Sequence, residues 1–150
     1  MSNYLYRQAS ISDIPYLAKI RAGNSATEEH WTNRITGYHN GTVNPQKAEQ
    51  SRIIFISSHN DKIIGFIAGH LTKRFDCDGE LQWIDVMAEY RRSGIASELL
   101  KELAKWFINQ KSYKVCIDPG NDEARKFYQK NGATNLNDHW MYWADIRQII

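Results

Sequence analysis

A strand, a basic turn and a helix follow one another in residues 81–107, and this stretch most constrains the fold. Its first part is apolar and prone to form a β-strand, with Leu81, Trp83, Ile84 and Val86. Its last part is amphipathic, with apolar residues recurring at helical spacing at Leu99, Leu100, Leu103, Trp106 and Phe107. The sequence therefore predicts a strand that leads through a short polar turn into a helix.

The turn has the composition of an anion-binding site. Its glycine and alanine let a ligand come close to the backbone, and the first N–H groups of a helix have no intrahelical partner. The helix dipole adds about half a positive charge, and two arginines add full ones. We therefore expect a phosphate group to bind at this turn, whose residues are Arg91, Arg92, Ser93, Gly94, Ile95, Ala96 and Ser97. The alternative is a solvated basic turn.

The motif at this turn differs from two common phosphate-binding motifs. No Gly-Lys-Ser/Thr follows the glycine, as it would in a P-loop, and the third glycine of the dinucleotide fingerprint is missing. The turn instead resembles the acyl-CoA signature of the GNAT N-acetyltransferase superfamily, Gln/Arg-x-x-Gly-x-Gly/Ala. Arg91, Gly94 and Ala96 match it, five residues after the strand-ending Val86.

A second segment, residues 121–133 (NDEARKFYQKNGA), resembles the other signature of this superfamily, Asn-x-x-Ala-x-x-(Phe/Leu)-Tyr-x-x-x-Gly-Phe. The matching residues are Asn121, Ala124, Phe127, Tyr128 and Gly132. Ala133 replaces the usual large apolar residue, which affects core packing more than chemistry. The likeness covers residues 11–143, most of the chain.

The predicted elements follow the GNAT order, β-α-α-β-β-β-α-β-α-β-β. We expect strands at 4–8, 52–57, 63–71, 80–86, 114–117, 133–136 and 140–144. Helices are expected after a Ser12 cap until the break at Gly23-Asn24-Ser25, at 27–38, at 95–110 and at 121–131, with a further helical turn at 45–50. The resemblance implies an α/β (α+β) fold, a mixed, mostly antiparallel sheet of six to seven strands flanked by four helices, with splayed fourth and fifth strands. Gly65 and Gly69, unusual inside a strand, indicate close approach or a bulge.

Composition indicates one domain, residues 1–150, of ordinary globular character. Hydrophobic residues make up 42% and charged residues 24%, and a net charge of +2 does not favour nucleic-acid binding. Cys77 and Cys116 are far apart in the sequence and lack the CxxC spacing, so neither a metal site nor a disulfide framework is predicted. No signal-peptide core or membrane span is evident, and we expect a cytoplasmic protein.

The resemblance implies how acetyl-CoA would be held and its thioester cleaved. The backbone groups of Ile84 and Val86 would pair with the pantetheine arm, and the Ile84 N–H would polarise the acetyl carbonyl. Asn121 would bind the pantetheine or pyrophosphate, or serve as a helix N-cap, or do both. Tyr128 stands where the family has a tyrosine general acid, although it could also be a core aromatic residue.

A carboxylate can take the proton that the attacking amine must lose. Glu80 lies eleven residues before Arg91, the spacing of the catalytic glutamate in the histone-acetyltransferase branch of the family. Asp85 is the rival, but on a regular strand it has the opposite parity and projects to the other face. Glu80 could also be an exposed charge where the strand begins.

The sequence therefore indicates an N-acetyltransferase that moves an acetyl group directly to a primary amine in a ternary complex. The residues expected to bind the acceptor are Glu28, Trp31, Gln82 and Trp83. We expect a small-molecule acceptor because helices one and two read as long and aromatic-rich. The alternatives are a protein lysine or N-terminal acetyltransferase and a non-catalytic acyl-CoA sensor. We expect no metal, nucleic acid or membrane partner, and by family analogy a homodimer.

Overall fold

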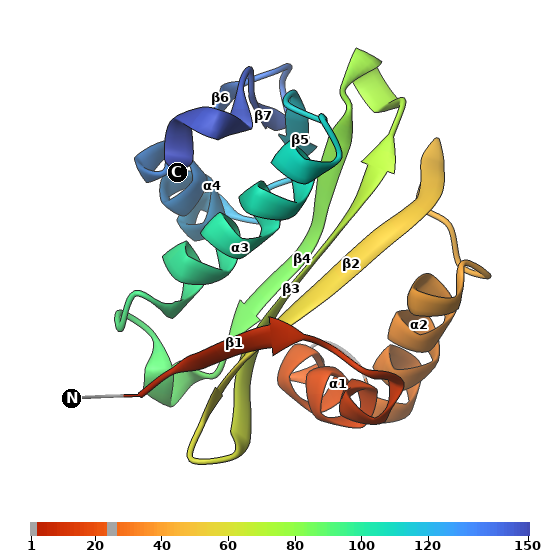
Figure 1. Cartoon of the computed structure of the whole chain (residues 1–150), viewed down its shortest axis with the longest axis vertical. Coiled ribbons are helices and arrows are strands. Elements are labelled where there is room, and N and C mark those ends of the chain that lie inside the picture. The colour runs from red at the N-terminus through yellow and green to blue at the C-terminus, as the bar shows by residue number, and fades with distance from the viewer. Residues whose placement is uncertain (1–2, 24–26) are drawn as a thin grey trace.

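In the computed structural model, which describes residues 3–23 and 27–150, seven strands form one sheet (Figure 1). They are β1 (Leu5–Gln8), β2 (Ala48–His59), β3 (Lys62–Thr72), β4 (Gly79–Val86), β5 (Val115–Ile117), β6 (Thr134–Asn135) and β7 (Met141–Trp143). Their order in the sheet is β1-β2-β3-β4-β5-β7-β6. Neighbours are antiparallel except for β4 and β5, which are parallel. This mixed sheet confirms the predicted fold class.

Helices cover both faces of the sheet. The described residues form α1 (Ile14–Ala22), α2 (Glu28–Asn40), α3 (Ile95–Asn109) and α4 (Asp122–Lys130). Figure 1 shows α1 and α2 on one side of the sheet and α3 and α4 on the other. Two separate cores result: Leu17, Ile35 and Tyr38 pack on the first face, and Leu99 and Leu103 pack on the second. The nearly continuous apolar character of the central strands follows from this double burial.

Three strand glycines let α3 lie close against the sheet. A methyl group added to Gly69 or Gly79 would clash with Leu103 or Phe107, respectively, and one added to Gly65 would meet the Asp85 carbonyl at 3.0 Å and Leu99 at 3.5 Å. These three side chains are spaced four residues apart and so form one stripe along α3. The predicted close approach at Gly65 and Gly69 is therefore confirmed, and Gly79 is a third such position.

The sheet opens between β4 and β5. The two strands pair only where residues 79–81 face residues 115–117, whereas β4 continues to Val86. Met87 donates its N–H to the Ile64 carbonyl of β3. Because successive residues of a strand direct their backbone groups to opposite edges, Asp85 also faces β3. The groups of Ile84 and Val86 then point to the open edge.

A β-bulge at Gln82 reverses the side-chain alternation of β4. Trp83 pairs with Ala68 of β3, while Leu81 pairs with the very next β3 residue, Gly69. One extra residue thus lies on β4. Leu81 consequently packs in the core beneath α3, although Trp83 packs in the core beneath α1 and α2.

Several predicted boundaries are wrong in detail. The helical turn expected at 45–50 is a β-turn in which Ala48 N–H bonds to the Pro45 carbonyl, and β2 already begins at Ala48. The first N-cap is Ser10 rather than Ser12, because Ser10 and Asp13 form a capping box at the 3-10 turn η1 (Ile11–Asp13). Gly23 follows α1, whereas 24–26 lie outside the described residues.

Short 3-10 turns complete the chain, and none of them was predicted as an element. The others are η2 (Arg74–Asp76), η3 (Ala88–Tyr90) and η4 (Ile146–Ile149). The final hairpin is shorter than expected, with only two residues in β6 and three in β7.

Candidate active site

A cleft of about 850 Å³ lies where β4 separates from β5. Its walls come from the end of β4, the start of α3 and one face of α4. The lining residues are Ile84, Asp85, Val86, Ala88, Tyr90, Arg91, Arg92, Gly94, Ile95, Ala96, Ser97, Asn121, Glu123, Ala124, Phe127, Tyr128 and Lys130. The cleft therefore brings together every residue predicted to bind the cofactor except Ser93.

The basic turn has the geometry expected of an anion site. Gly94 is the N-cap of α3, with a φ of 80°, and no side chain caps the helix. A Cβ added at Gly94 would meet nothing within 4 Å. The Nε of Arg91 donates to the Val86 carbonyl at 3.3 Å, which anchors that arginine beside the end of β4. The first N–H groups of α3 therefore face open space beside two arginines.

The second signature segment supplies the opposite wall of the cleft. The Asn121 side chain accepts a hydrogen bond from the Ala124 N–H at 2.8 Å, so Asn121 is an N-cap and also lines the cleft. Tyr128 is 4% exposed and contacts Phe127 and Trp143 edge to face. Burial raises the pKa of the Tyr128 phenol well above its usual value, and the negative charge of Asp85 raises it further. Tyr128 is therefore a protonated hydroxyl at neutral pH.

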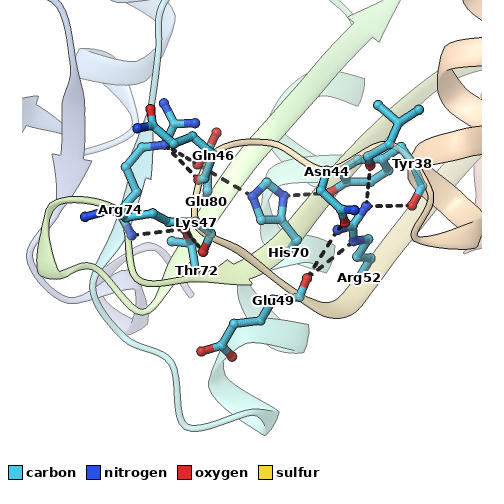
Figure 2. A network of polar contacts seen from close by, with 11 residues as sticks. Tyr38, Asn44, Gln46, Lys47, Glu49, Arg52, His70, Thr72, Arg74 and Glu80 are labelled. Carbon is cyan, nitrogen blue, oxygen red and sulfur yellow. Dashed lines mark hydrogen bonds and ion pairs between the residues drawn. The ribbon is translucent and has the colours of Figure 1, made fainter.

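Glu80 lies in a buried polar network outside the residues that line the cleft (Figure 2). It is 5% exposed, so it is not the exposed strand-entry charge that was the alternative. Its Oε1 lies 3.3 Å from Arg74 Nε and 3.5 Å from His70 Nε2. His70 is fully buried, and its Nδ1 hydrogen-bonds to the Tyr38 hydroxyl at 2.8 Å. Figure 2 shows His70 between Tyr38 and Glu80, with Arg74 on the far side of the carboxylate.

The same network ties β2 to the chain that follows α2. The Arg52 guanidinium donates to the backbone carbonyls of Tyr38 and Val43 at 2.9 and 2.8 Å, and it also bonds to the Asn44 side chain. It stacks over the Tyr38 ring at 4.8 Å. These contacts give the network a structural purpose, which is to hold α2 on the sheet.

Asp85 lines the cleft, and the prediction that it projects away from the face of Glu80 is wrong. Its Oδ2 accepts a hydrogen bond from Arg21 of α1 at 2.8 Å, which places Asp85 on the face covered by α1 and α2. Glu80 contacts His70 on that same face. The bulge at Gln82 is the reason, because one extra residue brings both carboxylates to one side. Burial raises the pKa of the Asp85 carboxyl, and the Arg21 guanidinium opposes that shift.

Two of the four predicted acceptor residues lie together on this face. The rings of Trp31 and Trp83 meet edge to face at 6.1 Å, and Arg21 stacks over Trp31 at 4.9 Å. Gln82 is the bulge residue, and its Oε1 is buried without a partner among the described residues. Glu28 is exposed in the first turn of α2. The expectation of a long first helix is wrong, since α1 has nine residues.

Metal sites, cysteines and membrane-spanning helices are the other features by which residues 3–23 and 27–150 could indicate a function. No three His, Cys, Asp or Glu side chains there are grouped so that they could hold a metal ion. Both cysteines are buried free thiols. No helix in the same ranges combines the length and apolar character needed to cross a membrane.

A mixed sheet that opens between β4 and β5, with a basic turn and a helix N-terminus at the opening, is the architecture of an acetyltransferase of the GNAT type. The comparison of the sequence with family models agrees: the model of the acetyltransferase (GNAT) family matches residues 23–133. The chain therefore belongs to the acetyltransferase (GNAT) family.

Solved structures share the fold over nearly the whole chain. The PaiA N-acetyltransferase of Thermoplasma acidophilum, solved with coenzyme A, is 19% identical and has a TM-score of 0.68, covering 95% of this chain and 99% of that one. An acetyltransferase of Thermus thermophilus is 15% identical, with a TM-score of 0.73 and coverage of 95% and 99%. The glucosamine-6-phosphate N-acetyltransferase of Arabidopsis thaliana is 18% identical, with a TM-score of 0.67 and coverage of 90% and 94%.

Proposed function

We propose that this protein transfers the acetyl group of acetyl-CoA to the primary amine of a small molecule, by direct attack in a ternary complex. The observation that carries the proposal is the cleft, which unites the basic turn, the open edge of β4 and Tyr128 in one space. The turn offers donors and positive charge for the pyrophosphate, and the open edge offers strand-like backbone groups for the pantetheine arm. Asn121 lies on the opposite wall.

The described residues can supply two of the required chemical functions. The N–H of Ile84 points to the open edge, where it can polarise the acetyl carbonyl as an oxyanion donor. The Tyr128 hydroxyl can donate a hydrogen bond, and then its proton, to the departing thiolate, and the raised pKa of the phenol makes the full transfer less favourable than for an ordinary tyrosine. Glu80 as the base stays a prediction, and its burial outside the lining of the cleft makes it the weaker candidate.

The half-buried ring of Trp31, which stacks on Arg21 beside Asp85, supports a small organic acceptor on the face of α1 and α2. A peptide lysine or N-terminal amine is the second candidate acceptor. An acyl-CoA sensor without transfer activity would use the same cleft, and only turnover separates it from an enzyme. The free cysteines fit a reducing compartment, and we place the reaction in the cytoplasm.

Calorimetric titration with acetyl-CoA and with CoA tests the anchor. In Gly94→Glu a carboxylate enters the open space at the turn, and we expect binding to weaken about 100-fold through repulsion of the pyrophosphate. Gly94→Ala is the matched control, because it carries the same positive-φ strain of about 1 kcal/mol without the charge. It should bind within about threefold of the wild type. Equal binding by all three proteins would refute the proposed site.

A thiol-release assay with acetyl-CoA then separates the enzyme from the sensor. The acceptors are 1,5-diaminopentane, spermidine, tryptamine, glucosamine 6-phosphate and a lysine dipeptide. Turnover of one of the first four supports the proposal, whereas turnover of the dipeptide alone favours a protein acetyltransferase. Tight acetyl-CoA binding without turnover of any of them would favour the sensor.

A further inference from the structure

The opening between β4 and β5 connects the two faces of the sheet. On β4, the side chains of Ile84 and Val86 belong to the core beneath α3. Asp85, between them, projects to the opposite face, where it meets Arg21 of α1. An acceptor that approaches from the side of α1 and α2 therefore meets Asp85 at the same level of β4 as the Ile84 N–H.

One oxygen of Asp85 is held and the other is available. Oδ2 bonds to Arg21 Nη1 at 2.8 Å, while Oδ1 has no hydrogen-bond partner among the described residues. The Asp85 side chain is 25% exposed, and it lines the cleft. Arg21 is itself fixed by stacking over Trp31 at 4.9 Å. The ion pair thus fixes a carboxylate that lines the cleft, and it leaves one of the two oxygens free to accept a hydrogen bond.

Two guanidinium groups, Arg21 and Arg91, oppose the effect of burial on the pKa of the Asp85 carboxyl and favour its charged form, the form that a cationic amine needs. On the same face, the half-buried ring of Trp31 meets the ring of Trp83, which is 5% exposed and belongs to the core. The charge of Asp85 reaches the Tyr128 phenol across the cleft. A carboxylate and a protonated phenol therefore face one reaction space, which is the pairing that a base and an acid require. Glu80, by contrast, is enclosed by Arg74 and His70.

We propose that Asp85 is the base of the transfer reaction and the residue that selects a cationic alkylamine, with Arg21 as the residue that positions it. This inference rests on the proposed function. The ammonium form binds at Asp85 Oδ1 and gives it one proton. The amine nitrogen then attacks the thioester carbonyl, so that a C–N bond forms and the C–S bond breaks. The Tyr128 proton goes to the thiolate, and the second nitrogen proton restores the phenol. Asp85 finally releases its proton to water.

The test compares two amines in an isosteric variant, Asp85→Asn. The alkylamine 1,5-diaminopentane is protonated at pH 7 and needs a base, whereas 4-methoxyaniline is already neutral. We expect kcat/KM for the diamine to fall about 100-fold, with a loss of less than about fivefold for the aniline. The affinity for acetyl-CoA should stay within about threefold. Equal losses for both amines, or no loss, would overturn the inference.

Two further carboxylate variants serve as comparisons. Asp118→Asn is the matched control, because exposed Asp118 follows β5 and its charge also raises the pKa of Tyr128. It should lose less than about threefold in kcat/KM. If Glu80→Gln, rather than Asp85→Asn, loses diamine turnover selectively, Glu80 is the base and the inference is wrong.

A binding measurement tests, without turnover, whether Asp85 selects a cationic amine. CoA-saturated protein is titrated with 1,5-diaminopentane and with the neutral 1,5-pentanediol. The wild type should prefer the diamine at least about tenfold, and Asp85→Asn should lose that preference. The absence of any preference in the wild type overturns the role of Asp85. Absence of all turnover with the preference intact overturns the proposed function and, with it, the role of Asp85 as the base, whereas the selection of a cationic amine by Asp85 stands.

Discussion

Because the α3 side chains pack directly on the strand glycines, we predict that the single methyl group added in Gly79→Ala lowers the free energy of unfolding substantially. The new Cβ would lie 2.3 Å from Phe107 Cε1, whereas ordinary contact begins at 3.4 Å. The ring would have to retreat by about 1.1 Å, the difference of these values. Phe107 is only 1% exposed and has no open space to enter. Overpacking of this kind costs about 1–3 kcal/mol, and we expect a value near the upper end.

Urea unfolding followed by circular dichroism measures this cost. With an m-value of about 2 kcal/mol/M, a loss of about 3 kcal/mol moves the midpoint by about 1.5 M. Gly120→Ala is the matched control, since a Cβ there meets nothing within 4 Å and the backbone has no positive φ. It should leave the free energy of unfolding unchanged or raise it by about 0.5 kcal/mol.

A second substitution identifies the clash as the cause. Phe107→Leu removes ring atoms, so it should cost less in the Gly79→Ala background than in the wild type, with a coupling energy of about 1 kcal/mol or more. Phe107 is thirteen residues from Gly94, about 20 Å along the helix, so acetyl-CoA binding should persist. If Gly79→Ala is as stable as Gly120→Ala, the reasoning about the stripe is refuted.

Three further predictions concern ionisable groups. Hydrogen bonds from Arg7 lower the pKa of Asp13 from 3.8 to about 2. The ionised carboxylate therefore contributes fully to the free energy of unfolding above about pH 4, and this contribution is lost as the pH falls toward 2. Because Arg7 is half exposed, Asp13→Asn should lower the free energy of unfolding in urea by only about 1 kcal/mol at pH 7. In the variant the free energy of unfolding should also fall less steeply between about pH 4 and pH 2. Tyr128→Phe should lower kcat by about 100-fold with little change in calorimetric acetyl-CoA affinity, and unchanged kcat would exclude the acid role. Arg74→Met should destabilise by about 3 kcal/mol through the unpaired Glu80, and adding Glu80→Gln should recover much of it.

Features that depend on short stretches of sequence were predicted well. The N-cap at Asn121 depends on a short local segment, and it is confirmed by the hydrogen bond that the Ala124 N–H donates to the Asn121 side chain. The basic turn is likewise local, and in the structure it lines one cleft together with the second signature segment. The order of the elements followed from periodicity, since each apolar strand and each amphipathic helix carries its own signal.

Features that depend on distant contacts were missed. No residue near Pro45 indicates that Ala48 pairs with Thr72. This pairing makes Ala48 part of a strand, so the helical turn predicted at 45–50 does not form. The burial of Glu80 depends on Arg74, which reaches it from the turn η2, where Phe75 and Asp76 have positive φ. These arrangements are decided by packing between segments rather than by local propensity.

Predicting the bulge on β4 would also have required knowledge of contacts between distant segments. Gly69 was a hint, because glycine inside a strand indicates a bulge or a close approach. However, the extra residue lies on the neighbouring strand, at Gln82, and its position became visible only from the pairing of β3 with β4.

The bulge also changes how this strand can be compared with those of other family members. If side chains are assumed to alternate regularly and are counted back from Arg91, Asp85 is assigned to the correct face of the sheet. Every β4 residue before Gln82 is then assigned to the wrong face. In a relative that lacks the extra residue, a carboxylate five positions before the equivalent of Asp85 would lie among the side chains under α3. A sequence alignment can therefore match Glu80 letter for letter with a residue that occupies the other side of the sheet.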